Sequence, residues 1–294
     1  MVVVEELDPI KYNYWIGLLG FFKEIDASQV AANFDPEKHY NQSEFQRELN
    51  EAIEYVKGIS GRQDMEPEVK EVNSSERTIK LKSDPTYKEH INGMTSDKIA
   101  LVELEKLHCF QPFLNEEYVN KLVEKTPDIG DSEGLMKFCL PLREEQTKNM
   151  VNASFNGTTN TYSLVTENLD FRVLGNVQGQ DNNSGRHFCG FAYGGGLPQM
   201  SAVKYGGITM IKNGYHRAYA LYLKGHKFAP FILMETPSFQ FTGATLPGFF
   251  PIELLQSNRA PLLSDFKSRA AVKLPRKRIR AVISIHAELQ FLTE

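Results

Sequence analysis

Hydrophobic and polar positions alternate along the chain in patterns that predict both helices and strands. Residues 12–25 are dense in large apolar side chains and predict a buried helix, with a partner-binding helix as the alternative. From Ser43, a Ser-x-x-Gln capping pattern precedes apolar residues at helical spacing, and Gly58 follows them. The spacing of Phe45, Leu49, Ile53 and Val56 therefore predicts a second helix.

Polar and glycine-rich stretches predict the connections. Residues 63–97 are mostly polar and predict a linker, within which the alternating residues 78–82 favour an edge strand. Residues 161–166 and 171–174 predict strands, whereas the glycine and asparagine of 175–187 and 194–196 predict long loops. Residues 282–292 predict a final strand.

The segment 208–225 predicts a short strand, a glycine turn and an amphipathic helix that opens on His216 and Arg217. The first N–H groups of a helix lack intrahelical partners and carry the positive end of its dipole. Asn213, Gly214, His216 and Arg217 could therefore converge on a phosphate. A plain strand-to-helix connection, with a capping Asn and an exposed Arg, is the alternative.

A second block, residues 99–124, predicts a strand, a Gln-Pro turn and a helix. Asn115 is a suitable N-cap with Glu116 and Glu117 in the first turn. Three side chains of the helix are expected to face a core: Tyr118, Val119 and Leu122.

These two blocks, in this order, resemble the ParB/sulfiredoxin superfamily, whose signature is a Gly-x-His-Arg or Gly-Glu-Arg-Arg turn between a strand and a helix. The resemblance covers about residues 99–235, and about seventy residues between the blocks have no counterpart. It implies an α+β fold: a ParB/sulfiredoxin-like mixed sheet with flanking helices, an N-terminal helical extension and a C-terminal appendage. The expected domains are 1–95 (helical section and linker), 96–235 (the ParB/sulfiredoxin-like domain with a long central insertion) and 236–294 (the strand-bearing appendage).

The chain departs from the family in two places. Tyr215 occupies the position of the catalytic cysteine of sulfiredoxin, so that reduction chemistry is not expected. No helix-turn-helix pattern follows Glu235, which argues against a centromere-binding clamp. A nuclease, a nucleotide hydrolase and a small-molecule kinase remain open, because a shared fold does not fix the reaction.

The charge and composition of the chain limit the classes of partner that it is expected to bind. A formal charge of -4 and a pI near 6.0 give no general affinity for nucleic acid or anionic membrane. Any DNA or RNA contact is expected at the basic run Arg276, Lys277, Arg278 and Arg280, for which a solvated turn is the alternative. Three scattered cysteines fit a reducing cytoplasm, and no apolar stretch is long enough to span a membrane.

The sequence thus predicts binding of a nucleoside triphosphate or diphosphate, with metal-assisted phosphoryl transfer or hydrolysis and Mg²⁺ as the expected ion. Gly214 would allow close approach at the turn that also contains Tyr215, Arg217 would clamp an oxyanion, and His216 would donate to phosphate or move a proton. Lys212 or Arg186 would add charge. The alternative is a non-catalytic module that senses a nucleotide or holds DNA or a protein partner, including a second copy. Carboxylates near Arg217 would discriminate the two, and the candidates are Glu103, Glu117, Asp170 and Glu235.

Overall fold

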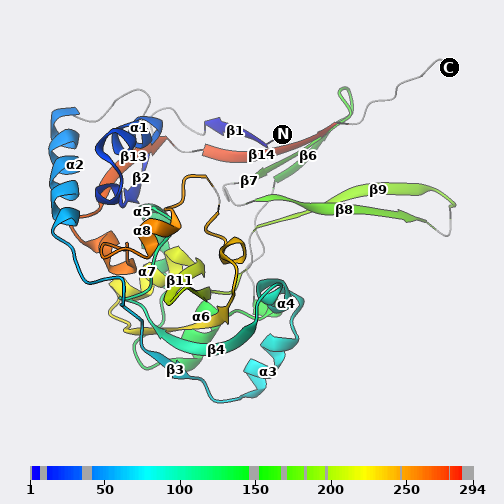
Figure 1. Ribbon diagram of the computed structural model, residues 1–294. Helices are drawn as coiled ribbons and strands as arrows, with labels where there is room; N and C mark the ends of the chain where they lie inside the picture. Colours follow the sequence, from blue (N-terminus) through cyan, green and yellow to red (C-terminus); the bar gives the residue numbers. More distant parts are fainter. Residues whose placement is uncertain are drawn as a thin grey trace. The chain divides into compact units, whose positions relative to one another are not determined.

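A computed structural model describes residues 2–6, 12–34, 42–145, 152–166, 171–181, 184–195, 198–245, 247–277 and 279–286 (Figure 1). The chain separates into two compact units. The small unit comprises Met1–Lys11, Thr147–Gly196 and Lys277–Glu294, and the large unit comprises Tyr12–Gln146 and Leu197–Arg276. Strands and helices are mixed, which confirms the α+β class. The predicted domain ranges 1–95, 96–235 and 236–294 stay a prediction.

A five-stranded mixed sheet lies at the centre of the large unit. Its order is β11 (Ile208–Asn213), β10 (Ser201–Tyr205), β12 (Phe228–Glu235), β4 (Ser96–Glu103) and β3 (Val69–Glu71). β10 and β12 are parallel, and the other neighbours are antiparallel. β12 is an almost continuous apolar run that is buried from Ala229 to Met234, as expected of a strand covered on both faces.

A three-stranded sheet and the helices complete the large unit. The sheet has the order β13 (Val272–Lys277), β2 (Tyr12–Gly17) and β5 (Phe113–Asn115). The helices are α1 (Glu24–Phe34), α2 (Gln42–Lys57), α3 (Glu76–Ser83), α4 (Pro85–Ile91), α5 (Glu116–Lys125), α6 (Ser132–Cys139), α7 (Tyr215–Leu223) and α8 (Ile252–Leu255). Short 3₁₀ turns are η1 (Leu19–Phe21), η2 (Arg143–Glu145), η3 (Phe239–Thr242) and η4 (Leu263–Lys267).

The small unit consists of strands. Four form a sheet in the order β1 (Val2–Glu6), β14 (Ile279–His286), β7 (Thr161–Thr166) and β6 (Asn152–Asn156). A two-stranded antiparallel ribbon pairs β8 (Arg172–Gln180) with β9 (His187–Gly194). Leu164, Phe171 and Ile283 form the buried cluster of this unit.

Several predicted elements are confirmed. The segment 208–225 folds as β11 and α7, and residues 42–57 form α2 with Leu49 and Val56 buried. Asn115 caps α5 by accepting a hydrogen bond from the backbone of Tyr118. Tyr118 itself, expected in the core, is 50% exposed. The strand predicted over 282–292 is β14 as far as His286, and its remainder lies outside the described residues.

Three predictions are wrong. Residues 12–25 form β2 and η1 rather than one helix, because Trp15 and Ile16 pair with Asn115 and Leu114 of β5. Apolar density alone does not separate a buried strand from a buried helix. Residues 78–82 belong to α3, where Ser75 and Thr78 cap the helix reciprocally. The segment 63–97 is not a linker, since Leu81 and Tyr87 are buried in the main core.

The expected loop 175–187 is also different in the structure. Residues 172–180 and 187–194 form the β8–β9 ribbon. Gly175 and Gly190 sit within these strands with space around the position of a Cβ atom. Glycine in a strand weakens the alternating pattern by which strands are recognised, which explains the error.

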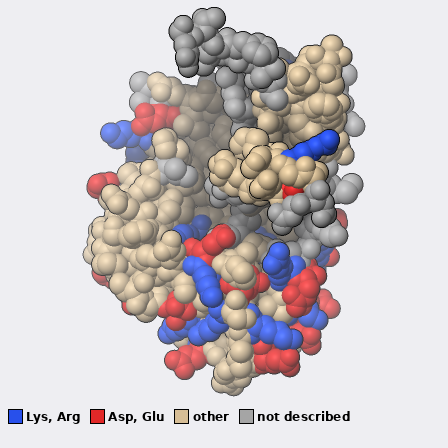
Figure 2. All heavy atoms as spheres, turned by 90° about the vertical axis from the view of Figure 1, so that its right-hand side faces the viewer, with Lys and Arg blue, Asp and Glu red and all other residues tan. Residues whose placement is uncertain are grey.

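In the lower part of the view in Figure 2, Lys and Arg side chains lie among Asp and Glu side chains. The described residues drawn there therefore form no continuous basic surface for a nucleic acid backbone. Among the described residues, no helix is both long and apolar enough to cross a membrane.

We expect the buried ion pair between Arg62 and Asp265 to be a main stabilising contact of the large unit. Arg62 donates to both carboxylate oxygens at 2.5 and 2.9 Å and also to the Ala260 carbonyl. Removing Asp265 leaves a buried guanidinium uncompensated, so Asp265→Ala should lower the free energy of unfolding by about 3 kcal/mol. The exposed Lys57–Glu54 pair is the control, and Glu54→Ala should cost less than about 1 kcal/mol. Equal losses in urea unfolding would contradict this assignment.

Candidate functional site

The turn between β11 and α7 has a backbone conformation that only glycine adopts easily. Gly214 has a φ of 94°, in the left-handed region. A Cβ atom added there would lie 2.5 Å from Cγ of Met200, which is too close. The turn therefore needs glycine for two independent reasons, its conformation and the lack of space.

Tyr215 and His216 contact the second sequence block. The Tyr215 hydroxyl accepts a hydrogen bond from the Phe110 amide at 3.0 Å, and the two rings pack edge to face. His216 Nε2 accepts from the Asn115 amide at 3.0 Å. Because Asn115 is the N-cap of α5, the Gly-Tyr-His-Arg turn positions the start of that helix. The structure thus brings together the two blocks that the sequence singles out.

These contacts define the chemistry open to His216. Burial, and then the Arg217 charge, lowers the pKa of His216 from 6.5 to about 4, so its ring is neutral at pH 7. Nε2 accepts a hydrogen bond and carries no proton. Phosphate donation or proton transfer by His216 stays a prediction, and Nδ1 is the nitrogen left for either role.

Arg217 and Lys212 are cations that bind backbone carbonyls. Arg217 Nη1 donates to the carbonyls of Phe138 and Cys139, both at 3.2 Å, and so satisfies the last turn of α6. Lys212 Nζ donates to the Phe241 carbonyl at 2.9 Å. Burial lowers the pKa of both cations. Among the described residues, neither cation forms an ion pair with a carboxylate.

Gln199 connects this turn to α4. Its carbonyl accepts from Asn213 Nδ2 at 2.8 Å, and its side-chain Nε2 donates to Thr86 Oγ1 at 2.8 Å. His90, one turn after Thr86 on α4, is 2% exposed. The buried atoms His90 Nε2 and Gln199 Oε1 have no hydrogen-bond partner among the described residues.

The charges of Lys212 and Arg217 act on His90. Burial, and then the charge of Lys212, lowers the pKa of His90 to about 4, and Arg217 adds to the effect. We call five residues the Gln199 cluster: His90, Gln199, Lys212, Asn213 and Arg217. The cluster combines positive charge with unsatisfied buried polar atoms, next to the N-terminus of α7. That helix has no side-chain N-cap and no acidic residue in its first turn.

Some of the other predicted site residues belong to the small unit, form ion pairs with lysines or lie outside the described residues. Arg186 is an exposed residue of the small unit. Glu103 pairs with Lys106 and Lys227, and Glu117 pairs with Lys121. Glu235 ends β12, and Asp170 lies outside the described residues. Across the part of the chain that the structure describes, no group of three or more His, Cys, Asp and Glu could hold a metal ion.

The basic run is only partly described. Arg276 lies over the rings of Trp15 and Phe34, with its guanidinium carbon 5.1 and 5.5 Å from the ring centres. Burial lowers its pKa. Lys277 ends β13, while Arg278 and the side chain of Arg280 lie outside the described residues. Arg276 therefore packs against aromatic rings in this structure, and a nucleic-acid role for the run stays a prediction.

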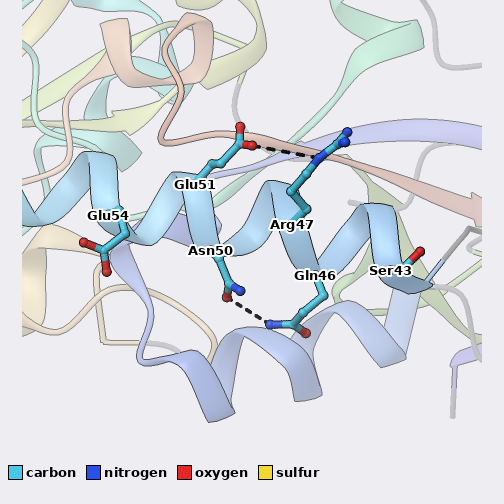
Figure 3. A pocket seen from close by; sticks show the side chains of 6 residues that line it. All are labelled: Ser43, Gln46, Arg47, Asn50, Glu51 and Glu54. Carbon is cyan, nitrogen blue, oxygen red and sulfur yellow. Dashed lines mark hydrogen bonds and ion pairs between the residues drawn. The ribbon is translucent and has the colours of Figure 1, made fainter.

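A shallow hollow follows the polar face of α2 (Figure 3). Its lining side chains, all from this helix, are Ser43, Gln46, Arg47, Asn50, Glu51 and Glu54. Gln46 bonds to Asn50, and Arg47 pairs with Glu51. These side chains pair along the helix surface, as in an ordinary solvated helix face.

Comparison with known proteins adds no relative. No protein-family model matches the sequence, and no curated protein or solved structure is significantly similar to the chain.

Sequence reasoning did not find three parts of this site. Phe138 and Cys139 belong to α6. Asp131, which caps this helix by accepting a hydrogen bond from the Gly134 amide, is the sequence signal that could have located it. His90 and Gln199 had no local signal, because neither residue is part of a motif. They join the site only through contacts between segments far apart in the sequence.

We expect Gly214→Ala to lower the free energy of unfolding by about 2–4 kcal/mol, from left-handed backbone strain plus the clash with Met200. The control is Gly225→Ala, at the other end of α7. Its φ is 89°, but its Cβ would lie 3.7 Å from the nearest atom, so only the backbone term of about 1–2 kcal/mol applies. Urea unfolding of both variants checks this, and equal losses would remove the packing argument.

The buried histidines should make stability depend on pH. Burial lowers the pKa of His90, His108 and His216 from 6.5 to about 4. A lowered folded-state pKa contributes stability that is complete above pH 6.5 and is lost as pH falls toward 4. Between pH 7 and 5 each histidine should account for a loss on the order of 1–2 kcal/mol. Denaturant midpoints at several pH values measure this, and His108→Gln should reduce the pH dependence by about a third. An unchanged slope in that variant would contradict the assignment.

Proposed function

We propose that the Gln199 cluster and the N-terminus of α7 bind the phosphates of a nucleoside triphosphate or diphosphate. The observation that supports this most is that Lys212 and Arg217, both partly buried, have no carboxylate partner among the described residues. An uncompensated buried cation is costly, and an anionic ligand would remove that cost. The adjacent helix N-terminus adds a field of the same sign.

The residues would divide the task as follows. Arg217 would use Nε and Nη2, for which the described residues offer no hydrogen-bond acceptor, while Nη1 stays on α6. Lys212 would add a point charge, and the N–H groups at the start of α7 would donate to phosphate oxygens. Gly214 would hold the turn in its left-handed conformation, with Met200 packed against the place where a side chain would stand. Tyr215 and His216 would position the turn through their bonds to the second block.

A ParB/sulfiredoxin-like fold is part of the proposal. Its support is the Gly-Tyr-His-Arg turn between a strand and a helix, the contact of this turn with residues 110–118, and the mixed sheet, which contains β11 before the turn and β4 of the second block.

Phosphoryl transfer is the less supported version. Mg²⁺ prefers oxygen ligands, mostly carboxylates, and the Gln199 cluster contains no carboxylate. Its side-chain oxygens are the neutral amide oxygens of Gln199 and Asn213, and these two groups beside two cations do not fit a magnesium site. The pairing of Glu103 and Glu117 with lysines favours the alternative, a module that senses or holds the nucleotide without turning it over.

Calorimetry with ATP, CTP, GTP and their diphosphates tests the proposal. Arg217→Ala should weaken binding roughly 10- to 100-fold, the scale of a lost charge-assisted hydrogen bond. The absence of binding heat with all of these nucleotides at millimolar concentration would contradict the proposal. Phosphate release by the wild-type protein would select the catalytic version.

Arg77→Ala is the matched control. Arg77 also holds a carbonyl at the end of α6, that of Leu140, at 3.0 Å, but its charge is neutralised by Glu145. Both variants therefore lose a contact to the same segment. If Arg77→Ala weakens nucleotide binding as much as Arg217→Ala does, the effect is structural and Arg217 is not a ligand contact.

A further inference from the structure

His90 differs from the other buried histidines in its surroundings. His216 Nε2 accepts a backbone hydrogen bond, and His226 Nε2 bonds to the Pro127 carbonyl at 2.9 Å. His108 has neither ring nitrogen bonded, but the cation acting on it, Arg62, is paired with Asp265. His90 combines an unbonded buried nitrogen with two cations that lack a carboxylate partner among the described residues.

The charged and polar groups that act on His90 come from two neighbouring segments. The side chain of Gln199, which precedes β10, raises the pKa of His90, although its Oε1 lies outside normal hydrogen-bond geometry with His90 Nε2. Lys212 on β11 and Arg217 on α7 both lower that pKa. In the free protein, burial and these two charges therefore keep His90 neutral at pH 7.

We propose that His90 takes up a proton from the solvent when a terminal phosphate, which carries two negative charges, binds at Lys212 and Arg217. This inference rests on the proposed function, because it concerns the same site. The anion would neutralise the two charges that oppose protonation of His90. The protonated ring would then be a third cationic group facing the ligand.

The balance between the charges of Lys212 and Arg217 and the charge of the bound anion also predicts the class of ligand. Two uncompensated cations match the two charges of a terminal phosphate or phosphate monoester. A phosphodiester, as in the backbone of a nucleic acid, carries one charge and would leave a net positive field at His90. Phosphate monoesters should therefore bind with proton uptake, and diesters should bind more weakly and without it.

The reciprocal effect follows from linkage. If the complex holds more protons than the free protein, affinity for the anion rises as the pH falls below 7.

The test is calorimetry of the wild-type protein with inorganic sulfate, a dianion that does not itself titrate in this range. Binding is measured at about pH 6 in two buffers with different heats of ionisation, because proton uptake makes the observed heat depend on the buffer. We expect a buffer-dependent heat equal to a substantial fraction of one proton. Dimethyl phosphate, a diester, should bind more weakly and show no such dependence.

His90→Gln should bind sulfate more weakly at pH 6, because the third cationic group is lost, and its binding heat should no longer depend on the buffer. His108→Gln is the matched control, because His108 is equally buried, has a pKa lowered to about 4 and lies outside the cluster. That variant should keep the buffer dependence. If His90→Gln does not fold, the wild-type comparison still decides, together with NMR titration of the histidine ring signals with and without sulfate.

The outcomes separate the two proposals. Sulfate binding with the same heat in both buffers overturns proton uptake and leaves the phosphate site in place. Loss of the buffer dependence in His108→Gln, with His90→Gln unchanged, overturns the assignment to His90. No binding of sulfate, inorganic phosphate or any nucleotide overturns the phosphate site, and this inference with it.

Discussion

The hydrogen bonds made by three consecutive side chains at the start of α7 determine how the large unit is assembled. Tyr215, His216 and Arg217 bind backbone groups that lie 78 to 105 residues earlier in the chain. Their partners are the approach to β5, the N-cap of α5 and the last turn of α6. Backbone groups of loops and helix ends must be satisfied when buried, so these bonds fix three segments at once. Gly214 makes this possible, because its left-handed conformation starts the helix directly after β11.

This explains which parts of the structure could be predicted. Local signals in the sequence predict three elements that the structure contains. An apolar run predicts β11, the glycine turn predicts the start of α7, and the capping Asn115 predicts the start of α5. The local sequence does not show which groups the side chains of this turn contact. A helix that opens on His-Arg looks the same in sequence whether it faces a ligand or the backbone of another segment. The errors at residues 12–25 and 175–187 have a related cause, because strand pairing with distant partners, not local pattern, selected the conformation there.

Among the described residues of the large unit, three arginines donate to backbone carbonyls, and they differ in whether a carboxylate balances their charge. Arg62 is paired with Asp265, and Arg77 is paired with Glu145. Arg217 has the same structural role without a carboxylate partner among the described residues. A buried guanidinium without a compensating charge is costly, and Arg62 and Arg77 each have a carboxylate partner. Proteins keep local arrangements of this kind mainly where function requires them, which is why the cluster, rather than either paired arginine, is the candidate site.

Arg217 binds backbone carbonyls of α6 and is also proposed to bind the ligand. The first role would affect the second. Because Nη1 is already held by two carbonyls of α6, the guanidinium is oriented before any ligand arrives. Less side-chain freedom is then lost on binding than for a free surface arginine, which favours affinity from few contacts. The same arrangement couples the ligand to the fold. An anion on the remaining nitrogens would strengthen the positioning of α6 against α7, and folded-state binding would raise stability in proportion to the logarithm of its concentration. If the proposed site binds an anion, its occupancy and the stability of the large unit would be linked through the Arg217 side chain.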